Sequence, residues 1–149
     1  FGNQGIVTSG TDIAFGVLMG SDKITGFSQA GGDELIFDIS AFGLSGGTEF
    51  AGAIGSLAVD SSEEIAILTG VGYATDELME DAVAGRVTTN AKDMIVIYFN
   101  TTTNKTHIVH DTDSSVDGTG TTTLIATLED FNTQTLHDTL DASNLNSFA

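Results

Sequence analysis

The feature that most constrains this chain is a turn at Gly31 and Gly32 that leads directly into alternating apolar side chains. Glycine enters left-handed backbone conformations at little cost, so two adjacent glycines favour a tight turn. The positions after the turn alternate as in a strand with one buried face, with Leu35, Phe37 and Ile39 set against Ile36 and Asp38. We therefore predict a strand that follows a glycine turn within residues 22–44.

Three carboxylates surround this turn, namely Asp22, Asp33 and Asp38. Calcium binds about six to eight oxygen atoms and accepts backbone carbonyls among them, so carboxylates at strand ends beside glycine turns suit this ion. Asp-rich turns are also common without any ion, because the Asp side chain bonds to nearby backbone groups. A calcium site and a solvated acidic turn are both open here.

The residues around the turn carry a family resemblance. Residues 22–27 read DKITGF and residues 32–40 read GDELIFDIS. Together they resemble the D-x-I-x-x-F…G-x-D-x-I-x-[FL]-[DS]-[IL]-S segment that closes the calcium-binding repeats of the RTX family, whose members are exported by type I secretion systems. Residues 10–15, GTDIAF, are similar to the family's G-A-D-T-F-V-F turn and add Asp12 to the implied calcium ligands.

A second part of the resemblance lies near the other end of the chain. Residues 110–128 resemble a strand, acidic loop and strand found near the C-termini of RTX proteins. The intact nonapeptide repeat G-G-x-G-x-D-x-U-x, which builds a calcium-filled parallel roll, is absent, and residues 1–20 carry only a degenerate version. We expect a chain that follows such a roll, or a relative that has replaced it.

The resemblance implies an extracellular, calcium-dependent structural domain of a secreted surface protein, contributing to an S-layer, filament or adhesin. It implies Ca²⁺ as the cofactor, self-association into a polymer or lattice, and the type I secretion machinery as the partner during export. The alternative is the secretion and capping end of an exported enzyme such as a protease or lipase. A third possibility is polymerisation through open strand edges, with residues 1–20 as the exchanging piece.

The net charge of the chain also favours divalent cations as partners. The chain has 21 Asp and Glu against 4 Lys and Arg, which gives a net charge of -17. Nucleic acid is therefore a poor partner, because its binding depends on clustered cations. Self-repulsion opposes compaction of so acidic a chain unless cations screen it, which favours divalent ions. Halophilic solvation is the alternative explanation.

Length and residue usage narrow the class of protein further. At 149 residues, 40% of them hydrophobic, the chain is predicted to form a single domain over residues 1–149. It has no cysteine for a disulfide or thiolate site and no proline, so its turns rely on Gly, Asn, Asp and Ser. No apolar run is long enough to predict insertion into a membrane. The start at Phe1 suggests a processed product or a fragment.

The chain as a whole predicts a mainly β fold. Short roll-like turns and a closing strand occupy residues 1–44, and residues 43–55 read as a small-residue loop anchored by Phe42, Phe50 and Ile54. Two short strands are expected at 57–59 and 64–68. Strands at 94–99, 106–110 and 121–128 are predicted to pair as an antiparallel meander or sandwich, because their connections are short. The composition of the tail, residues 129–149, is similar to that of the C-terminal secretion signals of RTX exports, and the alternative is a closing strand or short helix packed on the meander.

One helix is predicted near residues 75–85. Thr75 is a good N-cap, Asp76 and Glu77 favour the positive end of the helix, and Gly85 suits its end. An apolar stripe at helical spacing predicts contacts with the core, and consists of Leu78, Met79, Ala82 and Val83.

A second candidate calcium site is the loop over residues 111–118, which has D-x-D-x-S-x-D spacing. Asp111, Asp113 and Asp117 would direct alternate oxygens toward one point, as at the start of an EF-hand loop. The loop departs from that motif at Val116, where a turn glycine is expected, and at Thr122, where a bidentate Glu is expected. Calcium and a solvent-exposed acidic turn both remain open.

No catalytic motif is recognisable. His107 and His110 are three apart in a predicted strand, so they are expected to point to opposite faces and not to share an ion. The chain contains no H-E-x-x-H and no G-x-S-x-G. We therefore predict that the protein is not an enzyme, since a Ser, His and Asp set could be assembled on paper from any chain.

Overall fold

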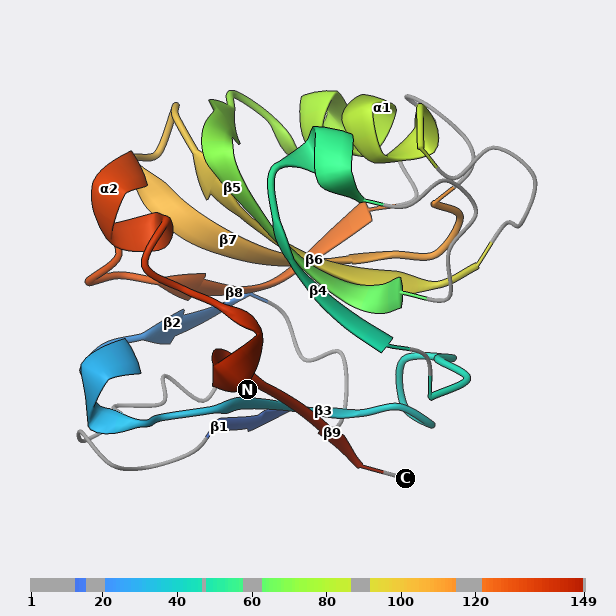
Figure 1. The fold of residues 1–149 in the computed structure, drawn as a ribbon, viewed down its shortest axis with the longest axis horizontal. Coiled ribbons are helices and arrows are strands. Elements are labelled where there is room, and N and C mark those ends of the chain that lie inside the picture. Colours follow the sequence, from blue (N-terminus) through green and yellow to red (C-terminus); the bar gives the residue numbers. More distant parts are fainter. Residues whose placement is uncertain are drawn as a thin grey trace.

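The computed structural model describes residues 13–15, 21–46, 48–57, 63–86, 92–114 and 122–148. Within these ranges the protein is mainly β, as predicted, and its strands form two layers (Figure 1). The larger sheet has six strands in the order β2 (Asp22–Ile24), β8 (Thr122–Leu128), β7 (Lys105–Asp111), β6 (Met94–Asn100), β5 (Glu63–Tyr73) and β4 (Thr48–Gly52). The smaller sheet has three, in the order β1 (Ile13–Phe15), β3 (Leu35–Asp38) and β9 (Leu145–Phe148).

Short helices connect the strands of the described chain. The α-helices are α1 (Asp76–Ala84) and α2 (Gln134–His137), and the 3-10 turns are η1 (Gln29–Gly31), η2 (Ile54–Ser56) and η3 (Ala142–Asn144). No helix in the described ranges is long and apolar enough to cross a membrane.

The predicted antiparallel meander is confirmed for β6, β7 and β8. The rest of the large sheet is different, because β5 pairs with β6 in parallel, β4 with β5 in parallel, and β2 with β8 in parallel. The antiparallel prediction concerned only the strands from residue 94 onward, so these parallel pairings lie outside it. The parallel pairing of β5 with β6 follows from the helix between them, since a crossover connection returns the chain in the same direction.

The central strands bury both faces. Ile65, Ile67, Ile95 and Ile97 point into a core between the two sheets, where they meet Phe37 and other residues of the small sheet. The alternate positions point to the opposite face, into a second core beneath α1, and include Ala66, Leu68, Val96 and Tyr98. Continuous apolar sequence in β5 and β6 therefore follows from burial on both sides.

Helix α1 forms as the sequence predicts. The Thr75 side chain accepts a hydrogen bond from the Leu78 backbone N–H at 3.2 Å, and the helix ends at Gly85. Met79 and Val83 are buried, whereas Leu78 is 50% exposed and is not part of the contact stripe. Gly85 has a right-handed φ of -64°, so the end of the helix does not use the left-handed freedom of glycine.

The glycine turn and the strand after it are confirmed. Gly32 has a left-handed φ of 78°, and Leu35 and Phe37 are fully buried. The strand stops at Asp38, one residue before Ile39. Parallel pairing of β1 with β3 fits the predicted roll-like turns, while residues 1–12 and 16–20 lie outside the described residues.

Three predictions about loops and the tail need correction. Residues 43–55 contain strand β4, because parallel pairing with β5 overrides the weak strand preference of small residues. Leu57 follows η2 instead of starting a strand, and residues 58–59 lie outside the described residues. The tail contributes α2 beside β5 and β6, but β9 pairs in parallel with β3 and so closes the small sheet instead of the meander.

The tail is fastened by the fully buried His137. Its Nε2–H donates to the Leu68 carbonyl at 2.7 Å, and its Nδ1 accepts from the Thr106 hydroxyl at 2.9 Å. Burial lowers the pKa of His137, and the Leu68 bond and the Asp138 charge offset only part of this effect. The tail is therefore held by a neutral imidazole that bridges β5 and β7.

Core burial on β6 can be tested with a matched pair of substitutions. Val96 is 0% exposed and Val71 is 43% exposed. We expect Val96→Ala to lower the free energy of unfolding by about 2 kcal/mol, because it removes buried methyl groups and leaves a cavity. Val71→Ala should change it by less than about 0.5 kcal/mol. Urea unfolding followed by circular dichroism measures both, and equal losses would contradict the two-faced burial of β6.

The neutral His137 predicts a pH dependence of stability. Since its pKa is lower in the folded state, the unfolded chain takes up a proton first as the pH falls below about 6.5. The free energy of unfolding should therefore fall between pH 7.5 and 5.5, and His137→Gln should reduce this slope. An unchanged slope in the variant would contradict the assignment.

Candidate functional site

The carboxylates of the glycine turn do not converge. The Asp33 side chain is buried and accepts from the Ser28 backbone N–H at 2.8 Å. Asp22 lies in β2, in the other sheet, opposite Ala126. Among the described residues no group of three or more His, Asp or Glu side chains is placed to hold a metal ion, and Asp12 lies outside the described residues.

Asp38 has a local role at the end of β3. Its Oδ1 accepts from the Ser40 hydroxyl at 2.7 Å, the Ser40 N–H at 3.0 Å and the Ala41 N–H at 3.1 Å. The bond from the Ser40 side chain is the main reason that the pKa of Asp38 is lowered. Asp38 therefore caps the turn after β3, as expected of a solvated acidic turn.

The second predicted site begins where β7 ends. Asp111 is fully buried, and its Oδ1 accepts from the Asp113 N–H at 2.9 Å. Ser114 is also fully buried, and its N–H donates to the Lys92 carbonyl at 3.2 Å. The Ser114 hydroxyl has no hydrogen-bond partner in the part of the chain that the structure describes. Asp117 lies outside the described residues.

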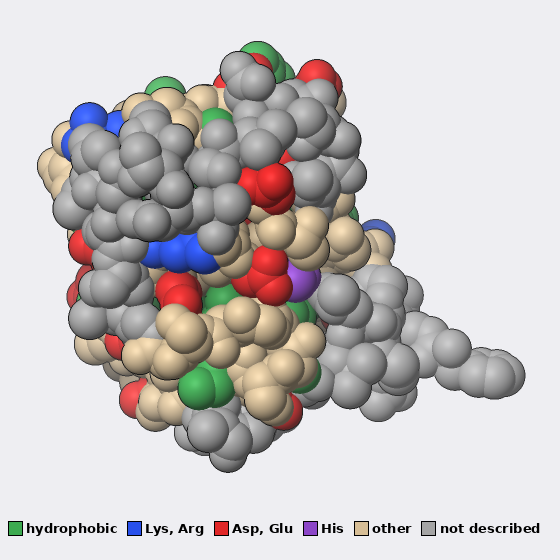
Figure 2. All heavy atoms as spheres, turned by 90° about the vertical axis from the view of Figure 1, so that its right-hand side faces the viewer, with side chains coloured by type: hydrophobic (Ala, Val, Ile, Leu, Met, Phe, Trp, Pro, Cys, Tyr) green, Lys and Arg blue, Asp and Glu red, His purple; other side chains and the backbone are tan. Residues whose placement is uncertain are grey.

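Acidic and basic groups meet on this side of the molecule. Strand β6 starts and β7 ends at the right of Figure 1, and the space-filling view of that side shows acidic side chains lying beside basic ones (Figure 2). Asp93 Oδ2 is 3.9 Å from His110 Nε2, which donates to the Phe42 carbonyl at 3.0 Å. Burial lowers the pKa of His110, so the imidazole adds little positive charge near Asp111.

The predicted orientation of the two strand histidines is confirmed. The ring of His107 packs against Tyr98, at 5.6 Å between centroids, in the core beneath α1. The ring of His110 packs against Phe42, at 5.3 Å, in the core between the sheets. The two imidazoles therefore lie on opposite faces of the large sheet, in different cores.

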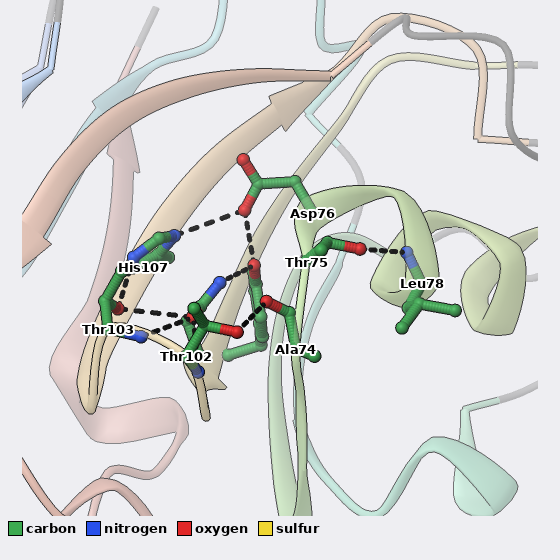
Figure 3. Close-up of polar contacts among 9 residues, drawn as sticks. Ala74, Thr75, Asp76, Leu78, Thr102, Thr103 and His107 are labelled. Carbon is green, nitrogen blue, oxygen red and sulfur yellow. Dashed lines mark hydrogen bonds and ion pairs between the residues drawn. The ribbon is translucent and has the colours of Figure 1, made fainter.

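A polar relay that the sequence did not reveal is built around His107 (Figure 3). His107 Nδ1 lies 3.2 Å from Asp76 Oδ1, and His107 Nε2 lies 2.9 Å from the Thr103 hydroxyl. The Tyr98 hydroxyl donates to the same Asp76 oxygen, and Asn100 Nδ2 donates to the Tyr98 hydroxyl at 2.9 Å. Asp76 and His107 are 31 positions apart, so only the packing of α1 on the sheet brings them together.

The relay has one consistent set of donors. Burial would raise the pKa of Asp76, but the bonds from His107 and Tyr98 outweigh it and lower the pKa below its usual value. Burial is the main cause that raises the pKa of Tyr98, so Tyr98 remains a donor. The carboxylate can only accept, hence His107 carries a proton on Nδ1. In the neutral imidazole Nε2 then presents a lone pair to the Thr103 hydroxyl, 2.9 Å away, and the same hydroxyl lies 3.3 Å from a second acceptor, Asn100 Oδ1.

The relay ends at a cleft of about 350 Å³. Its lining residues include Thr103 and His107 together with Lys23, Lys105 and Glu129. Lys105 Nζ is 3.3 Å from Glu129 Oε2 and donates to the Glu129 carbonyl at 2.6 Å. Two of the four Lys and Arg residues of this acidic chain therefore line one cleft.

Comparison of the chain with models of protein families, with curated proteins and with solved structures finds no match.

The Asp76 relay predicts a pH-dependent loss of stability on mutation. Asp76→Asn should cost about 1–3 kcal/mol at pH 7, because a half-buried acceptor of two hydrogen bonds is changed. Since the pKa of Asp76 is lowered by folding, this contribution exists above about pH 3.9 and is lost as the pH falls through the folded-state pKa. Urea unfolding of both proteins at pH 7 and pH 3 measures the difference.

Asp81→Asn supplies the control for that experiment, because Asp81 lies on the exposed side of the same helix. It should change the free energy of unfolding by less than about 0.5 kcal/mol at pH 7. Equal effects of the two substitutions would contradict the relay.

Proposed function

We propose that this chain is an extracellular, calcium-dependent, non-enzymatic structural domain of a bacterial surface protein exported by type I secretion. In this proposal the folded domain contributes to self-assembly into an S-layer, filament or adhesin. The single observation that carries the proposal is the burial of carboxylates in a chain that has few cations of its own.

The charge balance favours an external cation. Even if each of the 4 Lys and Arg side chains paired with one carboxylate, most of the 21 Asp and Glu could have no such partner. Four carboxylates are nevertheless almost fully buried: Asp33, Glu64, Glu80 and Asp111. Removing a charge from water is unfavourable unless hydrogen bonds or a counter-ion compensate. Hydrogen bonds meet part of this cost at Asp33 and Glu64, and divalent cations would screen the repulsion among the many carboxylates.

Of the two predicted calcium sites, the loop after β7 fits the ion better than the glycine turn does. A buried carboxylate at Asp111, a half-buried one at Asp113 and the buried Ser114 hydroxyl are hard oxygen donors of the kind that calcium prefers. Together with Asp117 these residues would hold the ion. Bound calcium would neutralise these carboxylates. The Ser114 N–H already ties the loop to the segment before β6 through the Lys92 carbonyl, so the loop is anchored where an ion would complete it.

Export and location are supported by the resemblance of residues 22–40 and 110–128 to RTX proteins. A chain that stays unfolded at low calcium inside the cell and folds at higher calcium outside is suited to export through a narrow channel. Self-association is supported by the strands at the sheet edges, since β4 and β9 end their sheets in the described ranges and an edge strand can pair with another chain.

The second candidate is a capping domain at the end of an exported RTX enzyme. It is favoured by one observation, namely that β9 pairs with β3 and so covers one edge of the small parallel sheet. A capping domain would gain stability from calcium as a monomer, whereas an assembly subunit would also polymerise.

Calcium should stabilise the domain through the loop after β7. At about 100 times its dissociation constant, calcium bound only to the folded state adds about 2.7 kcal/mol to the free energy of unfolding. Asp111→Asn and Asp113→Asn should lose most of this gain, while the exposed Asp81→Asn should keep it. Guanidinium unfolding in chelator and in millimolar calcium measures the gain, and midpoints that do not move in any protein would contradict the proposal.

The choice between the two candidates depends on the size of the particle. Light scattering and negative-stain imaging during the same calcium titration should reveal ordered polymers if the domain is an assembly subunit. A monomer stabilised by calcium would favour the capping domain.

A further inference from the structure

The relay at His107 ends on an accessible hydroxyl, which a purely structural network does not require. Asp76, Tyr98 and Asn100 form its inner end, and Tyr98 and Asn100 are buried. Thr103 forms its outer end, is exposed, and lines the 350 Å³ cleft with His107. A hydroxyl, an imidazole and a carboxylate in this order match the arrangement that activates an oxygen nucleophile.

The turn after β6 fixes the position of this hydroxyl. Asn100 Oδ1 accepts the backbone N–H groups of Thr102 and Thr103, each at 3.0 Å. The Thr102 hydroxyl donates to the Ala74 carbonyl at 2.7 Å, which ties the turn to the segment before α1. These contacts hold the backbone of Thr103, while its hydroxyl lies 2.9 Å from His107 Nε2 and 3.3 Å from Asn100 Oδ1.

The cleft adds a preference for the charge of a ligand. Lys23 and Lys105 bring two ammonium groups to a cleft whose lining also includes Glu129, and Lys105 is paired with that carboxylate at 3.3 Å. With two lysines and one glutamate the lining has an excess of one positive charge, so in a chain of net charge -17 a small anion is repelled less here than over most of the acidic surface.

We propose that Thr103 is a nucleophile that accepts an acyl group from a small activated ester or thioester bearing a carboxylate. The Thr103 oxygen attacks the carbonyl carbon while its proton passes to His107 Nε2. The bond from that carbon to the leaving oxygen or sulfur then breaks, and the leaving group takes the proton from His107. The products are a threonine ester and a free alcohol or thiol, with no oxidation or reduction.

Each residue has a separate role in this step. Thr103 and His107 contact the reacting atoms. Asp76 is a positioning residue that fixes the Nδ1–H tautomer of His107, and Tyr98 holds Asp76. Lys23 binds the carboxylate of the acyl chain, whereas Lys105 is paired with Glu129. This modification site is independent of calcium binding at the loop after β7.

The test uses the whole chain and two aryl esters of equal chain length. The anionic probe is the mono-4-nitrophenyl ester of adipic acid and the neutral probe is 4-nitrophenyl hexanoate. Release of nitrophenol gives the acylation rate, and mass spectrometry of peptides locates the acyl group. We expect one adipoyl group on Thr103, a faster reaction with the anionic probe, and about a fivefold loss of that preference in Lys23→Gln.

Variants distinguish a Thr103 hydroxyl that His107 activates from one that is merely exposed to the reagent. Thr103→Val should abolish labelling, and Thr103→Ser should retain it. His107→Gln should slow labelling by about 100-fold or more, because a general base contributes at least this much. Thr101→Val changes an exposed threonine of the same turn outside the relay, so it should leave the rate unchanged.

Circular dichroism spectra of all variants establish that they are folded before rates are compared. Labelling of Thr103 at the rate of other exposed hydroxyls would overturn the proposal. Equal labelling in the native chain and a folded His107→Gln variant would also overturn it.

Discussion

The structure depends on the burial of both faces of β5 and β6. Ile65, Ile67, Ile95 and Ile97 require a partner on one side, and Leu68, Val96 and Tyr98 require one on the other. The small sheet meets the first requirement and α1 meets the second (Figure 1). A parallel pair of this kind must be covered on both sides, and the helix that returns the chain from β5 to β6 is itself the cover of one face. The meander then extends the sheet from β6 by hairpins.

The same constraint produces the polar relay. Covering the sheet with α1 brings the first residue of the helix, Asp76, over the end of β6 and the start of β7. Its carboxylate then lies beside Tyr98 and His107, where the cost of burial is met by two hydrogen bonds. The cleft beside Thr103 lies where β2 adds to β8, so the residues of the relay and the cleft come from four separate segments. Packing of the core therefore creates chemistry that no local motif encodes.

Local signals in the sequence predicted the local structure. Thr75 and Gly85 bounded α1, the turn at Gly32 introduced β3, and short connections defined the meander. The parallel partners of β2, β4 and β9 could not be predicted, because parallel pairing joins remote segments and leaves no turn residue between them. Leu78 fitted the apolar stripe of the helix but lies at its edge and is exposed. Asp76 was predicted only as a helix-start residue, since nothing near it in the sequence indicates His107.

Negative charge is the remaining constraint on the fold, and we propose that calcium at the loop after β7 relieves it. The most direct measurement is a series of ¹H–¹⁵N correlation spectra of the isotope-labelled chain during addition of calcium at constant ionic strength, with magnesium as the comparison. We expect the amide resonances of Asp113 and Ser114 to shift first, together with those of Lys92 and Asp93. Magnesium should shift them less. Small shifts spread evenly over the exposed carboxylates, identical for both ions, would contradict this proposal.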